Sequence, residues 1–258
     1  MSLNINDLFS VRNKTVVITG GSRGIGEMIA RAYVENGAKV ILTSRKAADV
    51  EGLAKALGSA ATPIPADLSQ MAEIERFAAA VEALTPRVDI LFNNAGASWG
   101  APFDDFPELG WDKIMDINVK SVFFLTQRLI KLLEAAATPQ ANARVINIGS
   151  IDGQHVSPIE TYSYAASKAG VLHLTRMMAK NLAPRNIAVN AIAPGYFPSK
   201  MTAGIADMIN EESLKVTPMA RWGTPSDMAG VALFLGSQAS AYLCGSTITV
   251  DGGYATTA

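Results

Sequence analysis

Tyr164 and Lys168 stand four residues apart in the stretch Tyr-Ser-Tyr-Ala-Ala-Ser-Lys, residues 162–168. In a helix this spacing places both side chains on one face. A free tyrosine phenol has a pKa near ~10, and a fixed ammonium beside it favours the phenolate and lowers that pKa. The pair therefore predicts a general acid for carbonyl reduction, or a base for the reverse oxidation. The same spacing also arises by chance on surface helices, so the interpretation depends on the residues around it.

A glycine-rich loop, Gly-Gly-Ser-Arg-Gly-Ile-Gly at residues 20–26, follows a β-branched run at 14–19 and precedes an amphipathic helix at about 25–35. This order of strand, loop and helix is typical of a site for the phosphates of a dinucleotide, which face the helix N-terminus. Gly20 would allow the tight turn, Gly24 the approach of a pyrophosphate, and Gly26 close packing of helix and strand. A turn without a ligand would need fewer glycines. The expected contacts are Gly20, Ser22, Arg23, Gly24, Ile25 and Gly26.

The second strand, residues 39–43, leads to Ser44 and Arg45. Sites specific for NAD usually carry an acidic residue at the end of this strand, which binds the ribose 2′-hydroxyl. Here Ser44 takes that place, and the guanidinium of Arg45 suits a 2′-phosphate. A solvated loop arginine is the alternative, and Arg23 in the glycine loop argues against it. The sequence therefore predicts NADP(H) as the cofactor.

The chain alternates strands and helices, which predicts an α/β fold with a doubly wound, Rossmann-type parallel sheet of seven strands, in one domain over residues 1–258. Two prolines place the third strand at a sheet edge. The candidate residues follow strands, and ligands bind such sheets at the carboxyl ends of the strands. The expected strands are 14–19, 39–43, 61–65, 88–92, 143–148, 187–193 and 247–250, and further helices are expected at 73–84, 111–137 and 162–182.

Composition excludes several classes of protein. The net charge of −1 and the dispersed basic residues argue against nucleic acid and against an electrostatic membrane anchor. No apolar run approaches the ~18 residues of a spanning helix. The single Cys244, expected in the core, excludes an intramolecular disulfide and fits a reducing compartment, so a cytoplasmic enzyme is expected. No His/Cys/Asp/Glu cluster has the spacing of a metal site.

Taken together, these residues closely resemble the classical short-chain dehydrogenase/reductase family from about residue 12 to 254. Residues 221–225 and the Ser-Arg of the glycine loop look like its 3-oxoacyl reductase group. Residues 94–100 and 194–202 look like the rhamnolipid-associated branch of that group. The family resemblance rests on Thr19–Gly26, Asn93-Asn-Ala-Gly96, Ser150, Tyr164-x-x-x-Lys168, Pro194-Gly195 and Asp251-Gly-Gly253.

The resemblance implies a role for each catalytic candidate. Tyr164 would be the proton donor, and Ser150 would hydrogen-bond the substrate oxygen and stabilise the developing alkoxide. Lys168 would lower the pKa of Tyr164 and bind the nicotinamide ribose. Asn118 would support a water-linked proton path to Lys168, or it would only distort its helix through backbone bonding.

The resemblance also implies the rest of the cofactor site. Asp67 would face the adenine, Asn93 would lie near the adenosine ribose, and Ser199 would contact the carboxamide. Further contacts are expected from Ser44, Arg45, Leu68, Asn94, Ala95, Gly96, Tyr164, Lys168, Pro194, Gly195 and Phe197.

The favoured function is reduction of a carbonyl, such as a 3-oxoacyl thioester or related ketone, to a secondary alcohol with NADPH. Oxidation of a polyol, sugar or hydroxysteroid with NAD(P) and a non-enzymatic nucleotide-binding regulator are the alternatives. Family resemblance implies a homotetramer, with the helices around 118–133 and 165–182 at its interfaces. Substrate identity, chain length, direction and stereochemistry stay open.

His155, Arg185 and the apolar residues after Gly195 are further candidates for contact with a substrate or partner. His155 is expected as an exposed loop residue, with contact to substrate as the alternative. Arg185, after the catalytic helix, is the basic residue considered for docking of a carrier protein. The apolar residues Tyr196, Phe197, Met201 and Met208 predict either a packed helical lid or an apolar pocket that closes over the cofactor.

Overall fold

A parallel sheet of seven strands runs through the molecule in the order β3-β2-β1-β4-β5-β6-β7. The computed structural model describes residues 3–199, 215–255 and 257. The order reverses between β1 and β4, which is the switch point where doubly wound sheets bind ligands. The predicted fold class is confirmed. The strands are Thr15–Thr19 (β1), Lys39–Thr43 (β2), Ala61–Pro63 (β3), Ile90–Asn93 (β4), Ala143–Ile148 (β5), Ile187–Pro194 (β6) and Thr247–Val250 (β7).

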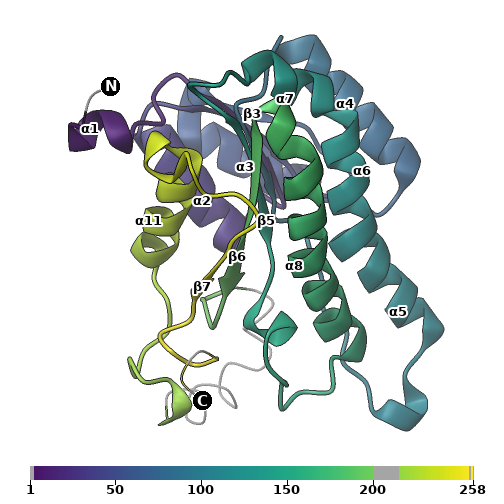
Figure 1. Cartoon of the computed structure of the whole chain (residues 1–258). Coiled ribbons are helices and arrows are strands. Elements are labelled where there is room, and N and C mark those ends of the chain that lie inside the picture. Colours follow the sequence, from purple (N-terminus) through teal and green to yellow (C-terminus); the bar gives the residue numbers. More distant parts are fainter. Residues whose placement is uncertain (1–2, 200–214, 256, 258) are drawn as a thin grey trace.

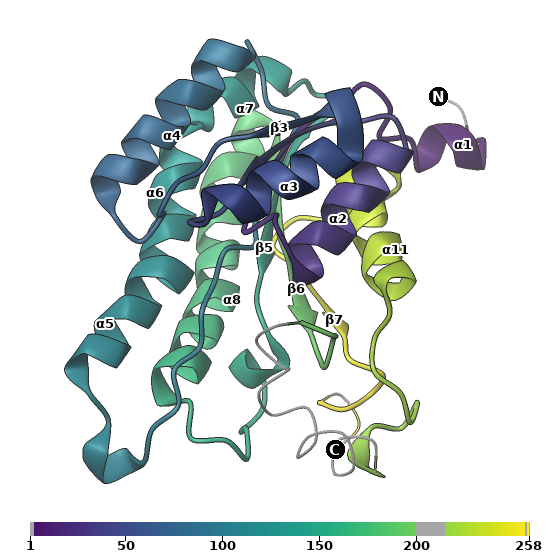
Figure 2. The same cartoon turned by 180° about the vertical axis from the view of Figure 1, so that it is seen from behind.

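Helices cover both faces of the sheet (Figures 1 and 2). Helices α4 to α8 lie on one face, and α2, α3 and α11 lie on the other. Strands covered on both faces are buried along their whole length and mostly apolar, as β5 and β6 are here. The helices are Ile5–Leu8 (α1), Gly24–Glu35 (α2), Ala47–Leu57 (α3), Met71–Leu84 (α4), Glu108–Met115 (α5), Ser121–Arg128 (α6), Ile130–Ala136 (α7), Tyr162–Leu182 (α8) and Pro225–Gly236 (α11).

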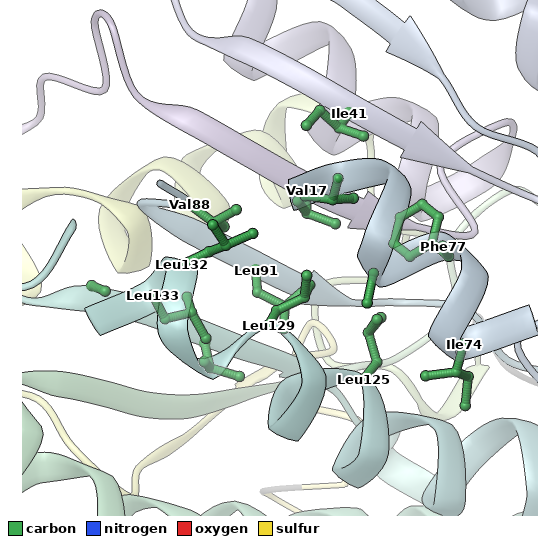
Figure 3. Packing of buried hydrophobic residues seen from close by; sticks show 14 of the residues in the cluster. Val17, Ile41, Ile74, Phe77, Val88, Leu91, Leu125, Leu129, Leu132 and Leu133 are labelled. Atoms are coloured by element: carbon green, nitrogen blue, oxygen red, sulfur yellow. The ribbon is translucent and has the colours of Figure 1, made fainter. Parts of the chain in front are cut away.

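Side chains from the sheet and one helix layer form a continuous buried cluster (Figure 3). Val17 of β1 and Leu91 of β4 pack there with Phe77 of α4 and Leu125 of α6. A second cluster under α2 and α11 includes Tyr33, whose hydroxyl donates to the carbonyl oxygen of Ala232 at 2.7 Å. The two clusters pack the sheet against both helix layers, and the candidate residues follow the carboxyl ends of these packed strands.

The structure departs from the sequence prediction at several elements. The helical region expected at 111–137 is broken by a π-helical segment, Asp116–Lys120, between α5 and α6. Helices α3 and α11 were not expected. Strand β3 does lie at the sheet edge, because Pro63 and Pro65 have no N–H to donate to a further strand. Cys244 is exposed and not in the core.

Candidate active site

Ser150 lies just beyond the carboxyl end of β5. Its buried Oγ accepts a hydrogen bond from the N–H of Asp152 at 3.2 Å, which starts the short turn Ile151–Gly153. Gly149 lets this segment approach α8, since a Cβ there would come 2.7 Å from Cδ2 of Leu172. The Ser150 side chain lies close enough to the Tyr164 hydroxyl to lower the pKa of the phenol. The turn therefore brings the serine hydroxyl to the tyrosine hydroxyl.

Tyr164 and Lys168 lie on the same face of α8, as the spacing predicted. The Lys168 Nζ is 5.5 Å from the centroid of the Tyr164 ring, and it donates to the carbonyl oxygen of Ile148 at 2.8 Å. Burial lowers the pKa of Lys168 to about 8, while the charge of Asp152 acts in the opposite direction. The lysine thus has a pKa within reach of neutral pH.

The pKa of Tyr164 differs from the expectation. Burial raises it to about 12, and the hydrogen bond to Ser150 offsets only part of that rise. The charge of Asp152 raises it further. The cost of burying the charged phenolate is therefore larger than the stabilisation of the phenolate by Ser150. Lys168 is not among the groups that lower the pKa of Tyr164. At neutral pH the Tyr164 hydroxyl is protonated, which suits a proton donor.

Asn118 occupies the π-helical segment between α5 and α6. Its Oδ1 accepts from the N–H of Ala97 at 2.9 Å, and its Nδ2 donates to the Ala97 carbonyl at 3.0 Å and to Ser167 Oγ at 2.8 Å. A Cβ on Gly96 would lie 3.2 Å from Asn118 Oδ1 and 3.7 Å from Lys168 Nζ. Asn118 therefore joins the loop after β4 to the catalytic helix, beside Lys168.

The glycine loop forms a narrow cradle at the start of α2. Gly20 and Gly24 have φ values of 61° and 54°, a region that side chains rarely adopt. A Cβ on Gly26 would overlap the carbonyl oxygen of Gly20, so α2 and β1 pack closely as predicted. Ser199 lies against this cradle, 3.2 Å from where a Cβ on Gly24 would stand. Exposed backbone N–H groups at a helix N-terminus fit a pyrophosphate.

Asn94 holds the glycine loop in place. Its Nδ2 donates to the carbonyl oxygens of Thr19 and Gly20 at 2.8 and 3.1 Å. In return, Thr19 Oγ1 accepts from the N–H groups of Asn94 and Ala95 at 2.9 and 2.8 Å. Thr19 was not among the predicted site residues, although it precedes the loop. The two side chains brace the cradle from behind.

Asn93 does not lie where a ribose contact requires it. Its Nδ2 donates to Thr126 Oγ1 at 3.0 Å and to Asn147 Oδ1 at 2.9 Å. Asn147 in turn donates to Thr175 Oγ1 at 2.9 Å, and all four side chains are buried. Strand residues alternate between the two sides of the sheet, so Asn93 faces the helices while Asn94 faces the loop. Asn93 links α6 to α8 through the core.

The residues expected around the adenosine end gather after β2 and β3. Arg23 and Arg45 are exposed, and neither forms an ion pair with a carboxylate in the part of the chain that the structure describes. Ser44 Oγ donates to the Lys46 carbonyl at 3.1 Å. Asp67 Oδ1 accepts from Ser69 Oγ at 2.8 Å, so that hydrogen bond orients the carboxylate.

Four predicted cofactor residues point their side chains into the protein. Leu68 and Phe197 are buried, and Ile25 and Ala95 pack against the core clusters. Phe197 lies on Gly223, which has no side chain to obstruct it. Leu68 and Phe197 can therefore meet a cofactor mainly through their backbone, while Ile25 and Ala95 are partly exposed. Pro194 ends β6, and Gly195 rests on Asp251; Met201 and Met208 lie outside the described residues.

His155 is not the exposed loop residue that was expected. Its side chain is 20 % exposed, and its Nε2 lies 3.6 Å from Asp152 Oδ1. Its ring meets that of Tyr254 edge-on, with centroids 5.1 Å apart. Asp152 was not predicted either, although its position two residues after Ser150 was visible in the sequence.

The sequence of this chain is similar to those of known proteins. A family model described as enoyl-(acyl carrier protein) reductase matches residues 20–255. The rhamnolipids biosynthesis 3-oxoacyl-[acyl-carrier-protein] reductase of Pseudomonas aeruginosa is 45 % identical over 95 % of this chain and 98 % of its own. The 5-keto-D-gluconate 5-reductase of Escherichia coli is 36 % identical over 96 % of this chain and 98 % of its own.

A solved structure extends the comparison to three dimensions. The Pseudomonas aeruginosa RhlG/NADP active-site complex superposes with a TM-score of 0.93 at 44 % identity and covers 96 % of this chain and 98 % of that one. The chain therefore belongs to the short-chain dehydrogenase/reductase family of oxidoreductases.

Proposed function

We propose that this protein reduces a ketone to a secondary alcohol with NADPH, and that its substrate is a 3-oxoacyl thioester. The observation that carries the proposal is that Ser150 and Tyr164 come together at the end of β5, beside the buried ammonium of Lys168. Two hydroxyls that meet at the end of β5 can both reach one carbonyl oxygen. The relative that is 45 % identical is a 3-oxoacyl reductase by name, which supports the substrate class.

NADPH, when bound, supplies the hydride. The protein's own groups then handle the developing negative charge on oxygen. Ser150 donates a hydrogen bond to it, and Tyr164 transfers its proton, which the high pKa of its hydroxyl keeps available at neutral pH. Lys168 positions the tyrosine and the ribose, and Asn118 supports proton return to Lys168. The glycine loop and these residues lie at one edge of one sheet, which supports the proposal that residues 1–258 form a single domain.

The cofactor is NADP(H). The cradle at residues 20–26 fits a pyrophosphate, and Arg23 and Arg45 are exposed cations near the end of β2. The solved relative at 44 % identity is an NADP complex, which supports the choice. The two arginines and Ser44 would contact the 2′-phosphate.

The position of Arg185, far from Tyr164, argues against docking of a carrier protein at this residue. Arg185 follows the end of α8 opposite Tyr164, roughly 30 Å away at the rise of an α-helix. Its Nε donates to Glu134 Oε1 at 2.7 Å, so its charge is already paired. We therefore favour thioesters of coenzyme A or free ketones over carrier-bound substrates.

The deciding experiment follows NADPH depletion with acetoacetyl-coenzyme A, carrier-bound acetoacetyl and 5-keto-gluconate as substrates. The thioester of coenzyme A is expected to turn over fastest. A strong preference for the carrier-bound substrate would contradict the docking argument. Preference for 5-keto-gluconate would contradict the thioester proposal and would indicate a sugar-acid reductase, like the relative that is 36 % identical.

We also propose that the protein is a homotetramer and that it is located in the cytoplasm. The location is inferred from the single cysteine, which fits a reducing compartment. Large apolar side chains are exposed on the helices that would pair, including Phe123 of α6 (41 %) and Met177 of α8 (51 %). Apolar surface of this kind marks an interaction site. Sedimentation velocity at micromolar concentration should show a tetramer, and Phe123→Glu with Met177→Glu should dissociate it. A monomeric unaltered protein would contradict the proposal.

A further inference from the structure

Asp152 and His155 meet directly behind the catalytic groups. The Nε2 of His155 lies 3.6 Å from Asp152 Oδ1, and the two side chains are only 20 % and 21 % exposed. Nε2 is buried and makes no hydrogen bond to any described residue. The other nitrogen, Nδ1, lies 2.9 Å from the carbonyl oxygen of Val156. Because a carbonyl oxygen only accepts, Nδ1 carries a proton, and Nε2 faces the carboxylate.

The turn that carries Asp152 rests on the catalytic helix. Asp152 donates its N–H to Ser150 Oγ, so the carboxylate belongs to the same turn as the substrate-binding serine. A Cβ on Gly153 would come 2.7 Å from the Ala169 nitrogen and from the Lys168 carbonyl carbon. Any movement of Asp152 is therefore passed to Ser150 and α8.

Aromatic rings close the other side of His155. The Tyr254 ring packs edge-on against it, and its centroid lies 5.3 Å from that of the Tyr196 ring. Gln154 accepts from Thr249 Oγ1 at 3.0 Å, which fixes the loop to β7. The described titratable groups facing the pair are Lys168 and Tyr164 of α8, Tyr196 after β6 and Tyr254 after β7.

The charge of the pair reaches both catalytic groups. Burial raises the pKa of Asp152, while His155 and Lys168 oppose that rise. In turn, a negative charge on Asp152 raises the pKa of Tyr164 and of Lys168. An uncompensated carboxylate here would therefore make the phenolate of Tyr164 harder to form.

We propose that Asp152 and His155 together carry one proton and act as a positioning pair, which holds the Ser150 turn on α8 and has no net charge. The proton resides either on Asp152 Oδ1 or on His155 Nε2, and the pair is neutral in both cases. The proposal rests on the carbonyl chemistry proposed above. It adds two residues that contact neither substrate nor cofactor and act through Tyr164 and Lys168.

The test is the acid limb of kcat for alcohol oxidation, which follows deprotonation of Tyr164 in the complex with alcohol and NADP⁺, where the cationic nicotinamide favours the phenolate. His155→Gln removes the proton carrier and leaves Asp152 uncompensated, so the limb should move to higher pH by on the order of one pH unit. Asp152→Asn keeps the site neutral and should move it by less than half as much. The double variant should return the limb to the position of Asp152→Asn. A purely structural role predicts no such restoration, because a second damaging change would add to the first.

Two controls separate the possible failures. If Tyr164→Phe retains turnover, the proposed function fails. If Tyr164→Phe is inactive but His155→Gln leaves the limb in place, or the double variant does not restore it, only the pair is refuted. Fluorescence titration should show unchanged NADPH affinity in all three pair variants, and a loss of affinity in any of them would refute the pair as proposed.

A measurement on the unaltered protein covers the case in which a variant does not fold. The chain has 2 histidines, so spectra of His173→Gln, a change at an exposed position of α8, leave only the His155 signals. Nitrogen NMR should show Nδ1 protonated at neutral pH. A bare Nδ1 with the proton only on Nε2 would overturn the proposed geometry.

Discussion

Lys168 donates from Nζ to the carbonyl oxygen of Ile148 at 2.8 Å, which ties the ammonium of α8 to the last residue of β5. Ser150 follows two residues later, so the same contact fixes the distance between the strand that carries the serine and the helix that carries Tyr164. A charge-assisted hydrogen bond of this kind is among the stronger ones in proteins. Because this ammonium is buried, its charged form lowers the free energy of unfolding.

Lys168→Met should change how stability depends on pH. The folded-state pKa of Lys168 is lowered from 10.5 to about 8. Between these values the unfolded chain binds more protons than the folded one, so stability rises with pH across that window. Relative to the variant, the unaltered protein should gain up to about 3 kcal/mol between pH 8 and pH 10.5. Urea unfolding at pH 7, 8, 9 and 10 measures this, and a difference that does not vary with pH would contradict it.

Tyr164→Phe should remove the proton donor and keep the ring near Lys168. General acid–base groups contribute about 10²–10⁴-fold, so kcat should fall on that scale while NADPH affinity is retained. Tyr162→Phe is the matched control, because Tyr162 lies two residues away on α8 and its hydroxyl donates to the exposed Glu160 at 2.7 Å. Steady-state kinetics and fluorescence titration check both variants. Equal losses in the two would contradict the assignment.

Cofactor preference should depend on residues 44 and 45. Hydrogen bonds to charged groups contribute about 1.5–3 kcal/mol each, so even one such contact favours NADPH over NADH by at least ~10-fold. Ser44→Asp with Arg45→Ile should reverse the order, because a carboxylate repels the 2′-phosphate and accepts from a 2′-hydroxyl. Lys55→Ile, an exposed lysine on α3, controls for the loss of charge alone. The measurement is kcat/KM with each cofactor; equal use of both by the unaltered protein would refute this role.

Two glycines in helices should respond in opposite ways to alanine. Gly26→Ala places a methyl against the carbonyl oxygen of Gly20, so thermal stability and NADPH affinity should both decrease. Gly230→Ala in α11 meets nothing within 4 Å. There alanine should stabilise by about 0.5–1 kcal/mol, the usual gain in a helix interior. Melting temperatures of the two variants decide the point, and a stabilised Gly26→Ala would show that the cradle is looser than the structure indicates.

The sequence by itself determined the parallel sheet, the glycine cradle and the Tyr164–Lys168 pair. Each depends on a local pattern: β-branched runs make buried strands, clustered glycines permit turns with positive φ, and a spacing of four puts two side chains on one helix face. Even the boundaries of α8, residues 162–182, follow from such a pattern.

Only the tertiary structure decided the remaining roles. Asn93 and Asn94 are adjacent and identical in type, yet one faces the core and the other the glycine loop, because successive strand residues point to opposite sides. The pKa of Tyr164 is set by burial, which no spacing reveals. His155 meets Asp152 and Tyr254 only because a turn after β5 and the segment after β7, about 100 residues apart in sequence, converge at the same edge of the sheet. Contacts between distant segments carry no local signal in the sequence, so they appear only when the chain is folded.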